Sequence, residues 1–131
     1  MKKVSYLLSA ALIALTFAAC SSSNTPEGAV NAYLKALQAN DSRKALEMFY
    51  FSKPVSPEAM DEYVQMVDEK VNKQNEKKQG IASWEIGEVQ MAEDKASAIV
   101  PYTVKYGDGT EQSDSQKTVK IDGKWLLDSG K

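Results

Sequence analysis

The spacing of apolar residues changes once along this chain, and that change limits its fold more than any other feature. Between residues 26 and 71 the apolar side chains recur three and four positions apart, which is the spacing of amphipathic helices. From residue 82 onward they alternate with polar ones, which is the spacing of strands. Helices followed by a run of strands predict an α+β domain, in which three helices pack on one antiparallel sheet.

Each of the three predicted helices has a capping residue in front of it. Thr25, Asp41 and Ser56 carry side-chain oxygens that can accept a hydrogen bond from the first helical turn. Proline follows two of these caps, at a position where its missing N–H breaks no helical hydrogen bond. The second helix is predicted to run to about Phe51. The third is predicted to continue into residues 72–79, which lack an apolar face and should fray or project into solvent.

Four strands are predicted in the second half of the chain. The parity of the apolar positions slips at Gly87, which indicates a β-bulge that bends the first strand. The second strand contains Pro101, which cannot donate a hydrogen bond, so an edge position or an irregularity is expected there. Asp122-Gly123 is typical of a type I′ hairpin turn before a last, short strand at 124–128. The bend predicts a curved sheet with a concave inner surface.

Two segments of the domain resemble a known family. The domain starts with P-E-x-x-V-x-x-Y-L-x-A-L-x-x-x-D-x-x-x-A from residue 26 and ends with D-G-K-W-L-L from residue 122. In order and spacing they resemble the nuclear-transport-factor-2-like superfamily, especially small bacterial lipoproteins of unknown function with that fold. The resemblance implies a cone, in which a curved four-stranded antiparallel sheet wraps three helices, with a pocket at the open end. It implies no activity, because this fold serves enzymes, transport adaptors and interaction modules alike.

The first twenty residues predict export and a lipid anchor. Two lysines precede an uncharged apolar run of 16 residues, positions 4–19. That run is shorter than the ~20 residues that cross a bilayer as a helix, so it indicates a signal peptide. It ends at Cys20, the only cysteine, directly after two alanines. The arrangement resembles a bacterial lipoprotein signal, which implies removal of residues 1–19 and a thioether-linked diacylglycerol on Cys20. An ordinary cleaved signal peptide is the alternative.

The position of the anchor sets the expected organisation and location. Residues 20–25 form the lipidated cysteine and a short linker, and residues 26–131 form a single domain. Ser21 stands where many lipoproteins of the Gram-negative inner membrane have aspartate, so the resemblance implies the periplasmic face of the outer membrane. A Gram-positive source would place the protein on the outer leaflet of the plasma membrane instead.

Composition excludes several kinds of chemistry. The chain has no histidine, and lipidation uses its one cysteine, so Ser-His-Asp and Cys-His catalysis and metal sites built from these residues are excluded. The acidic segment from Asp108 to Asp114 lacks the spacing of a calcium loop, and a solvated hairpin turn is the stronger interpretation. No metal or cofactor is expected. With 16 basic and 18 acidic residues, the chain offers no basic face for nucleic acid.

Aromatic residues on the predicted apolar faces are the candidate binding residues. They are Tyr33, Phe49, Tyr63, Trp84, Tyr102 and Trp125. Aromatic side chains normally fill a core, and that role is favoured here. Alternatively they line a cavity, where hydroxyl and indole N–H groups could orient a small apolar or peptide-like ligand.

Three classes of function remain open. The prediction is a non-enzymatic protein, tethered to the membrane, that binds a small apolar or peptide-like ligand in the cone. A module that binds an envelope protein through an exposed surface, with a filled core, is the alternative. The third class is an isomerase- or dehydratase-like enzyme of the carboxylate–tyrosine type. Such an enzyme needs a buried carboxylate beside a tyrosine, and no residue of the chain could be matched to that arrangement.

Overall fold

The computed structural model describes residues 24–130, and its three helices precede most of its strands. The helices are α1 (Pro26–Gln38), α2 (Ser42–Glu47) and α3 (Pro57–Lys78). The strands are β1 (Phe49–Tyr50), β2 (Ile81–Ile86), β3 (Gln90–Met91), β4 (Ser97–Tyr106), β5 (Glu111–Ile121) and β6 (Lys124–Asp128). The predicted signal peptide and the lipidation site at Cys20 lie outside the described residues.

The predicted helix caps are confirmed. The side chains of Thr25, Asp41 and Ser56 each accept a hydrogen bond from the backbone N–H three residues further on, at 3.0 to 3.1 Å. Each of these bonds satisfies a donor that the first helical turn leaves without a partner. Pro26 and Pro57 occupy the first turns of α1 and α3, as expected.

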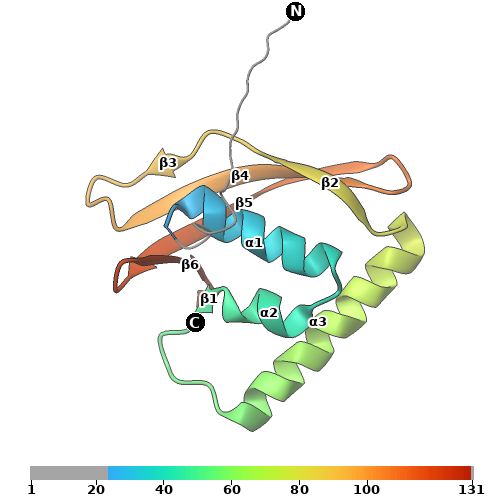
Figure 1. Ribbon diagram of the computed structural model, residues 1–131, viewed down its shortest axis with the longest axis horizontal. Helices are drawn as coiled ribbons and strands as arrows, with labels where there is room; N and C mark the ends of the chain where they lie inside the picture. Colours follow the sequence, from blue (N-terminus) through green and yellow to red (C-terminus); the bar gives the residue numbers. More distant parts are fainter. Residues whose placement is uncertain (1–23, 131) are drawn as a thin grey trace, which may run out of the picture.

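One curved sheet wraps around α1 (Figure 1). The strand order is β1-β6-β5-β4-β2, and β3 pairs with β4 beyond the end of β2. Neighbouring strands are antiparallel except β1 and β6, which are parallel. Helix α2 lies next to α1, and α3 packs mainly against α2, with its C-terminal end held at β4 and the hairpin that follows it. This is the predicted α+β class, with helices packed on a curled sheet.

The core lies between α1 and the concave face of the sheet. One cluster joins α1 to β4 and consists of Val30, Leu34, Val100, Val104 and Tyr106. A second joins α1 to β4 and β6 and consists of Ala29, Ala98, Trp125 and Leu127. Together with the half-buried Tyr102, which packs against the first cluster, the residues from β4 are every second position of that strand, so the predicted period-two apolar face is confirmed.

The sheet has six strands, whereas four were predicted, and Pro101 accounts for part of the difference. The predicted first strand is divided into β2 and β3 by residues 87–89, which lie opposite Pro101 of β4. Pro101 has no N–H to donate there, and its carbonyl accepts the N–H of Gly87 at 2.7 Å. The predicted bulge at Gly87 is therefore a break in the strand, and the register shift of β2 lies between Ile81 and Ser83.

The second helix is shorter than predicted, which adds the sixth strand. Helix α2 ends at Glu47, and the following residues form β1, in which Phe49 pairs with Leu127 of β6. The N–H of Leu127 donates to the carbonyl of Met48 at 2.8 Å. Because the sheet uses this carbonyl, the helical hydrogen-bond ladder stops before it. The prediction of a purely antiparallel sheet was wrong for the same reason.

Fraying or projection into solvent was predicted for the C-terminal part of α3. It does not fray and stays helical to Lys78, while most of residues 72–79 are exposed. The side-chain amide of Gln74 donates to the hydroxyl of Tyr106 at 2.9 Å, and the Lys78 ammonium lies 4.7 Å from the centre of the same ring. The Asn75 amide donates to the side-chain oxygen of Asn40 at 3.0 Å. These contacts are polar or cation–π contacts, so hydrophobic periodicity did not reveal them.

Gly107 holds the end of α3 against the hairpin between β4 and β5. Its N–H donates to the carbonyl of Gly80 at 2.8 Å, and a Cβ at position 107 would lie 2.5 Å from the carbonyl oxygen of Gln79. Gly107→Ala is therefore expected to lower the free energy of unfolding by about 1–3 kcal/mol, because the added methyl overpacks against backbone. Urea unfolding measures the loss. Glu111→Ala, an exposed change in the same hairpin, should stay within about 0.5 kcal/mol, and equal losses in both variants would contradict the prediction.

Candidate ligand-binding site

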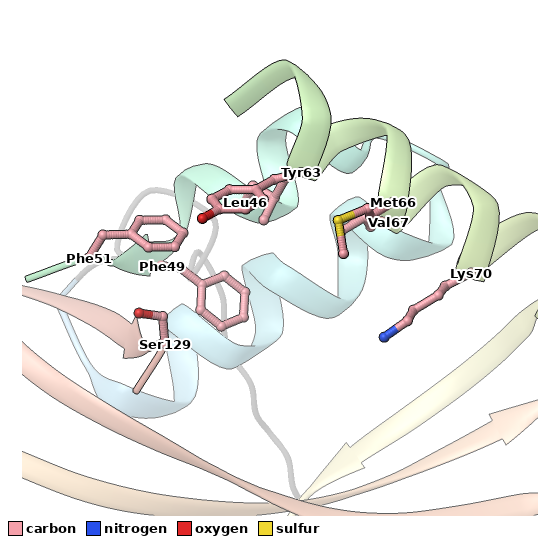
Figure 2. A pocket seen from close by; sticks show the side chains of 8 residues that line it. All are labelled: Leu46, Phe49, Phe51, Tyr63, Met66, Val67, Lys70 and Ser129. Atoms are coloured by element: carbon pink, nitrogen blue, oxygen red, sulfur yellow. The ribbon is translucent and has the colours of Figure 1, made fainter. Parts of the chain in front are cut away.

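A pocket with mostly apolar walls, called the apolar pocket below, lies where α2, β1 and α3 meet (Figure 2). Its volume is about 190 Å³. The side chains that line it are Leu46, Phe49, Phe51, Tyr63, Met66, Val67, Lys70 and Ser129. Lys70 and Ser129 add polar groups to walls that are otherwise aliphatic or aromatic. A concave apolar surface with a few polar groups is typical of a small-ligand site.

The apolar pocket is open because α3 is incompletely packed against the rest of the domain. None of the 22 residues of α3 is buried, and its apolar side chain Met66 is 57% exposed. Polar contacts join α2 to α3. The guanidinium of Arg43 lies 2.6 Å from the carboxylate of Asp61, and the hydroxyl of Ser42 donates to the carboxylate of Asp68. An amphipathic helix attached in this way leaves part of its apolar face available to a ligand.

A row of aromatic rings borders the apolar pocket. Phe51 stacks on Tyr63 with the ring centroids 6.0 Å apart and the planes at 16°. Phe49 lies 6.5 Å from Phe51 and meets the ring of Tyr33 edge-on at 5.3 Å. A second pocket, of about 370 Å³, is lined by Phe51, Lys53, Pro54, Val55, Ser56, Ala59 and Tyr63. Phe51 and Tyr63 line both pockets, so the two pockets are adjacent along α3.

A third pocket, called the tyrosine pocket below, lies inside the cone, between α1, the end of α3 and the concave face of the sheet. Its volume is about 160 Å³. It is lined by Tyr33, Leu34, Leu37, Gln74, Ile81, Tyr102, Val104, Tyr106, Gln112 and Asp114. Three tyrosines, two amides and one carboxylate give this pocket a more polar lining than the apolar pocket has.

Burial and a neighbouring negative charge act on the hydroxyls of the tyrosine pocket. Burial, followed by the charge of Asp114, raises the pKa of Tyr102 to about 12. The same two causes, in the same order, raise the pKa of Tyr33. Burial also raises the pKa of Tyr106, opposed by the hydrogen bond with Gln74. All three hydroxyls therefore stay protonated at neutral pH.

The acidic sequence around Asp114 indicated a turn, but Asp114 does not belong to one. It lies within β5, directly opposite Tyr102 of β4, so both side chains project from the same face of the sheet. Gln112, Gln116 and Thr118 follow the same alternation and share that face. Most of β5 has no apolar residue at these positions, so the period-two signal that identified the other strands did not locate Asp114.

The aromatic residues predicted from the sequence do not gather in one cavity. Phe49 and Tyr63 line the apolar pocket, whereas Tyr33 and Tyr102 line the tyrosine pocket. The edge-on contact between Tyr33 and Phe49 joins the walls of the two sites. The domain therefore has two separate candidate sites, and each contains two of the predicted residues.

The two tryptophans have mainly packing roles. Trp125 is only 4% exposed and lies in the second core cluster. Trp84 packs against the first cluster, and its indole N–H donates to the side-chain oxygen of Asn31 at 2.9 Å.

Four apolar residues that line the apolar pocket were not among the candidates predicted from the sequence, namely Leu46, Phe51, Met66 and Val67. The sequence predicts Phe51 at the end of a helix, whereas in the structure it follows β1.

The carboxylates of residues 24–130 do not supply the buried acid that the carboxylate–tyrosine class of enzyme needs. Their residues are exposed, apart from Asp128, which is half-buried. Asp114 is next to tyrosines but is itself exposed. Within the same residues no three potential ligands from Asp, Glu, Cys and His come together as a metal site. No helix in this part of the chain is long and apolar enough to cross a bilayer.

Helices packed on a curled sheet, with a pocket inside the cone, define the NTF2-like (nuclear-transport-factor-2-like) fold. The structure named "putative NTF2-like transpeptidase" from Campylobacter jejuni matches with 25% identity and a TM-score of 0.65, over 79% of this chain and 97% of that one. An NTF2-like protein of unknown function from Exiguobacterium sp. 255-15 matches with 15% identity and a TM-score of 0.39, over 76% and 94%. The intermembrane space region of the chloroplast protein ARC6 matches with 9% identity and a TM-score of 0.43, over 79% and 89%.

Within this class, the family can be stated. The family model described as "Domain of unknown function (DUF4878)" matches residues 18–128, which is most of the chain. The protein therefore belongs to that family, and its domain is NTF2-like. A comparison with curated proteins gave no match.

Proposed function

We propose that this protein is a membrane-anchored lipoprotein that binds a small apolar or peptide-like ligand and catalyses no reaction. The apolar pocket is the observation on which the proposal depends. It brings the apolar face of α3 opposite Phe49 and Phe51, with Lys70 at the other end of the lining from Phe51 (Figure 2). Burying these surfaces under a ligand would gain about 25 cal/mol for each Å² of apolar area removed from water.

The dimensions of the apolar pocket indicate the size of the ligand. An engineered cavity of about 150 Å³ is large enough for benzene, so 190 Å³ suits one branched or aromatic side chain or a short alkyl chain. An extended ligand could continue past the stacked rings of Phe51 and Tyr63 into the adjoining pocket. The ammonium group of Lys70 is placed to pair with an acidic group on such a ligand. A short fatty acid or an apolar peptide meets these requirements.

The sequence before the domain supports the anchor. Cys20 follows an apolar signal segment, and the linker from Ser21 to Thr25 has five residues, which span at most about 18 Å when extended. Acylation with two or more chains would hold the protein at the membrane. The absence of aspartate at position 21 supports the periplasmic face of the outer membrane. The ligand site would then work close to the bilayer surface.

A non-enzymatic role fits the chemistry that the domain contains. The Campylobacter jejuni relative has transpeptidase in its name, and transpeptidation by covalent catalysis requires an activated nucleophile. This chain has no histidine to act as a base, and its one cysteine precedes the domain. The acid nearest the tyrosines, Asp114, is exposed to water. These features favour binding over bond cleavage.

Thermal unfolding with octanoate tests ligand binding. The contacts described for the domain lie between residues 24 and 130, so a chain starting at Ser21 keeps them while lacking the acyl group. At 100 times its dissociation constant a ligand stabilises the folded state by about 2.7 kcal/mol. For a domain of this size the melting temperature should rise by about 10 °C. No rise with octanoate or with an apolar tripeptide would contradict the proposal.

Two methionines provide a matched pair of variants for this measurement. Met66 lines the apolar pocket and is 57% exposed, whereas Met91 of β3 is 50% exposed and is not part of its lining. Both should therefore tolerate replacement by asparagine without unfolding. Met66→Asn is expected to reduce the octanoate-induced rise at least severalfold, and Met91→Asn to leave it unchanged. Equal responses from the two variants would place the octanoate elsewhere on the protein.

A further inference from the structure

We propose that the tyrosine pocket binds the primary ammonium group of a small organic amine, at a site separate from the apolar pocket. The tyrosine pocket offers three features that together fit this group: hydroxyl oxygens without partners, a carboxylate and aromatic faces. This proposal does not depend on the ligand of the apolar pocket, because the two linings share no residue.

Two hydroxyls of the tyrosine pocket have unused hydrogen-bonding capacity. The hydroxyl of Tyr106 accepts from Gln74 at 2.9 Å and donates to Gln112 at 3.4 Å. Those of Tyr33 and Tyr102 have no hydrogen-bond partner among residues 24–130, although both side chains are half-buried. A polar group that is partly shielded from water and has no protein partner is stabilised when a ligand supplies the missing hydrogen bond. A ligand with several donors would supply such bonds.

The residues that line the tyrosine pocket carry formal charge of one sign only. Asp114 is the only formally charged residue in its lining, and it faces the pocket from β5 opposite Tyr102. One of its carboxylate oxygens, Oδ1, accepts the N–H of Ser115 at 2.8 Å, and the other has no such partner among the described residues. The negative potential of Asp114 adds to the burial that raises the pKa of Tyr33 and Tyr102. A potential that disfavours a phenolate favours a cation at the same place.

The aromatic rings suit an ammonium group as well. The Nζ atom of Lys78 already lies 4.7 Å from the ring centre of Tyr106, so a ring of this pocket binds a cation within the protein itself. Lys78 is not among the residues that line the pocket. The faces of Tyr33 and Tyr102 offer similar surfaces to a second cation.

The number of donors and acceptors distinguishes a primary ammonium from other cations. Its three N–H donors equal in number the two hydroxyl oxygens and the one Asp114 oxygen that have no partner among residues 24–130. A quaternary ammonium has no donor and would leave all three unsatisfied. The remaining lining, which includes Leu34, Leu37 and Val104, can contact an alkyl chain. The volume of the tyrosine pocket, about 160 Å³, is close to that of an engineered cavity of about 150 Å³ that binds benzene. An alkyl chain of about four carbons therefore fits.

Titration calorimetry of the mature lipoprotein in dodecyl maltoside, a neutral detergent, tests this proposal with n-butylammonium chloride. Saturable binding with one site is expected. Neutral 1-butanol and the tetramethylammonium ion should bind at least tenfold more weakly, because the first lacks the charge and the second lacks the donors. Absence of saturable binding of n-butylammonium, or equal binding of 1-butanol, would overturn the proposal.

Matched variants locate the site. Asp114→Asn should weaken n-butylammonium binding at least tenfold, whereas Glu111→Gln, a similar charge change on the same strand outside the lining, should not. Tyr33→Phe and Tyr102→Phe remove one acceptor each and should weaken binding severalfold, so the test survives if the aspartate variant folds poorly. Unchanged binding by the folded Asp114 or tyrosine variants would overturn the assignment. Met66→Asn should leave amine binding intact, which separates this result from a failure of the apolar pocket.

A further titration distinguishes a free small amine from a lysine side chain as the ligand. Nα-acetyl-lysinamide presents the same primary ammonium group on a peptide-like backbone. Tighter binding than n-butylammonium would support the proposal with a lysine side chain as the carrier. Weaker binding would support it with a free small amine as the carrier.

Discussion

Cys20→Ser is expected to reduce the incorporation of labelled palmitate into this protein from full labelling to background. Cysteine is the residue whose sulfur forms the proposed thioether, and the chain has no second cysteine that could replace it. The loss matters for location, because each buried CH₂ of an acyl chain contributes about 0.8 kcal/mol to membrane attachment. Among residues 24–130 no helix could take over as a transmembrane anchor.

The control for this prediction is Ser21→Ala, which changes the neighbouring residue and should keep the label. Mass spectrometry of the mature N-terminus provides an independent measurement, since it should find an acylated cysteine at position 20. An N-terminal peptide with a free thiol, or label that persists in Cys20→Ser, would contradict the anchor. The ligand site would then belong to a protein without a lipid anchor, and its proposed position close to the bilayer would no longer hold.

Leu127→Ala is expected to lower the free energy of unfolding by about 2–5 kcal/mol. Leu127 is completely buried in β6 and packs in the cluster that includes Ala29 and Trp125. Removing its side chain loses apolar burial and leaves a cavity that the surrounding sheet and helix cannot close fully. Its backbone bond to Met48 does not involve the side chain, so the effect should come from packing.

Leu126→Ala provides a matched control for this stability change. Leu126 is the preceding residue of the same strand, points to the other face of the sheet and is only half-buried. It should cost less than about 1 kcal/mol. Urea unfolding of the wild type and both variants measures the difference. Similar losses for the two leucines would show that the inner face of β6 has no special role in the core.

Local signals explain why much of the fold could be predicted. Thr25, Asp41 and Ser56 cap helices through atoms only three residues away, so each start is specified within one turn. Asp122 and Gly123 both have positive φ, as the predicted type I′ turn requires. The apolar alternation of β4 records which face of that strand meets the helices. Each of these features depends on residues that are close in the chain.

The errors have a common cause, because they involve partners that are distant in the sequence. The end of α2 depends on Leu127, which bonds to Met48 from the other end of the domain. The last turns of α3 are stabilised by hydrogen bonds with Tyr106 and Asn40. The division of the first predicted strand depends on Pro101 in the next strand. Apolar periodicity was absent in residues 72–79, continued past the end of α2 and only changed parity at Gly87, so it could not reveal these partners. Polar or backbone contacts decided the outcome at all three places.

The candidate sites were predictable only in part. Tyr33, Phe49, Tyr63 and Tyr102 were selected as aromatic residues on apolar faces, and each lines a pocket. Their separation into two pockets depends on the path of α3, which the α2–α3 contacts and the end near Tyr106 determine together. Asp114 was missed because a polar strand has no apolar alternation to reveal which of its residues face inward.

The sequence by itself determined the helix starts, the α+β class and the inward faces of the apolar strands, because these follow from caps, turns and periodicity over a few residues. It also supplied the predictions that the chain starts with an export signal and that Cys20 carries a lipid. The tertiary structure alone decided where α3 lies, which aromatic residues are core and which line a pocket, and that Asp114 faces the tyrosines. Those properties depend on how distant segments pack, and no short stretch of the chain contains that information.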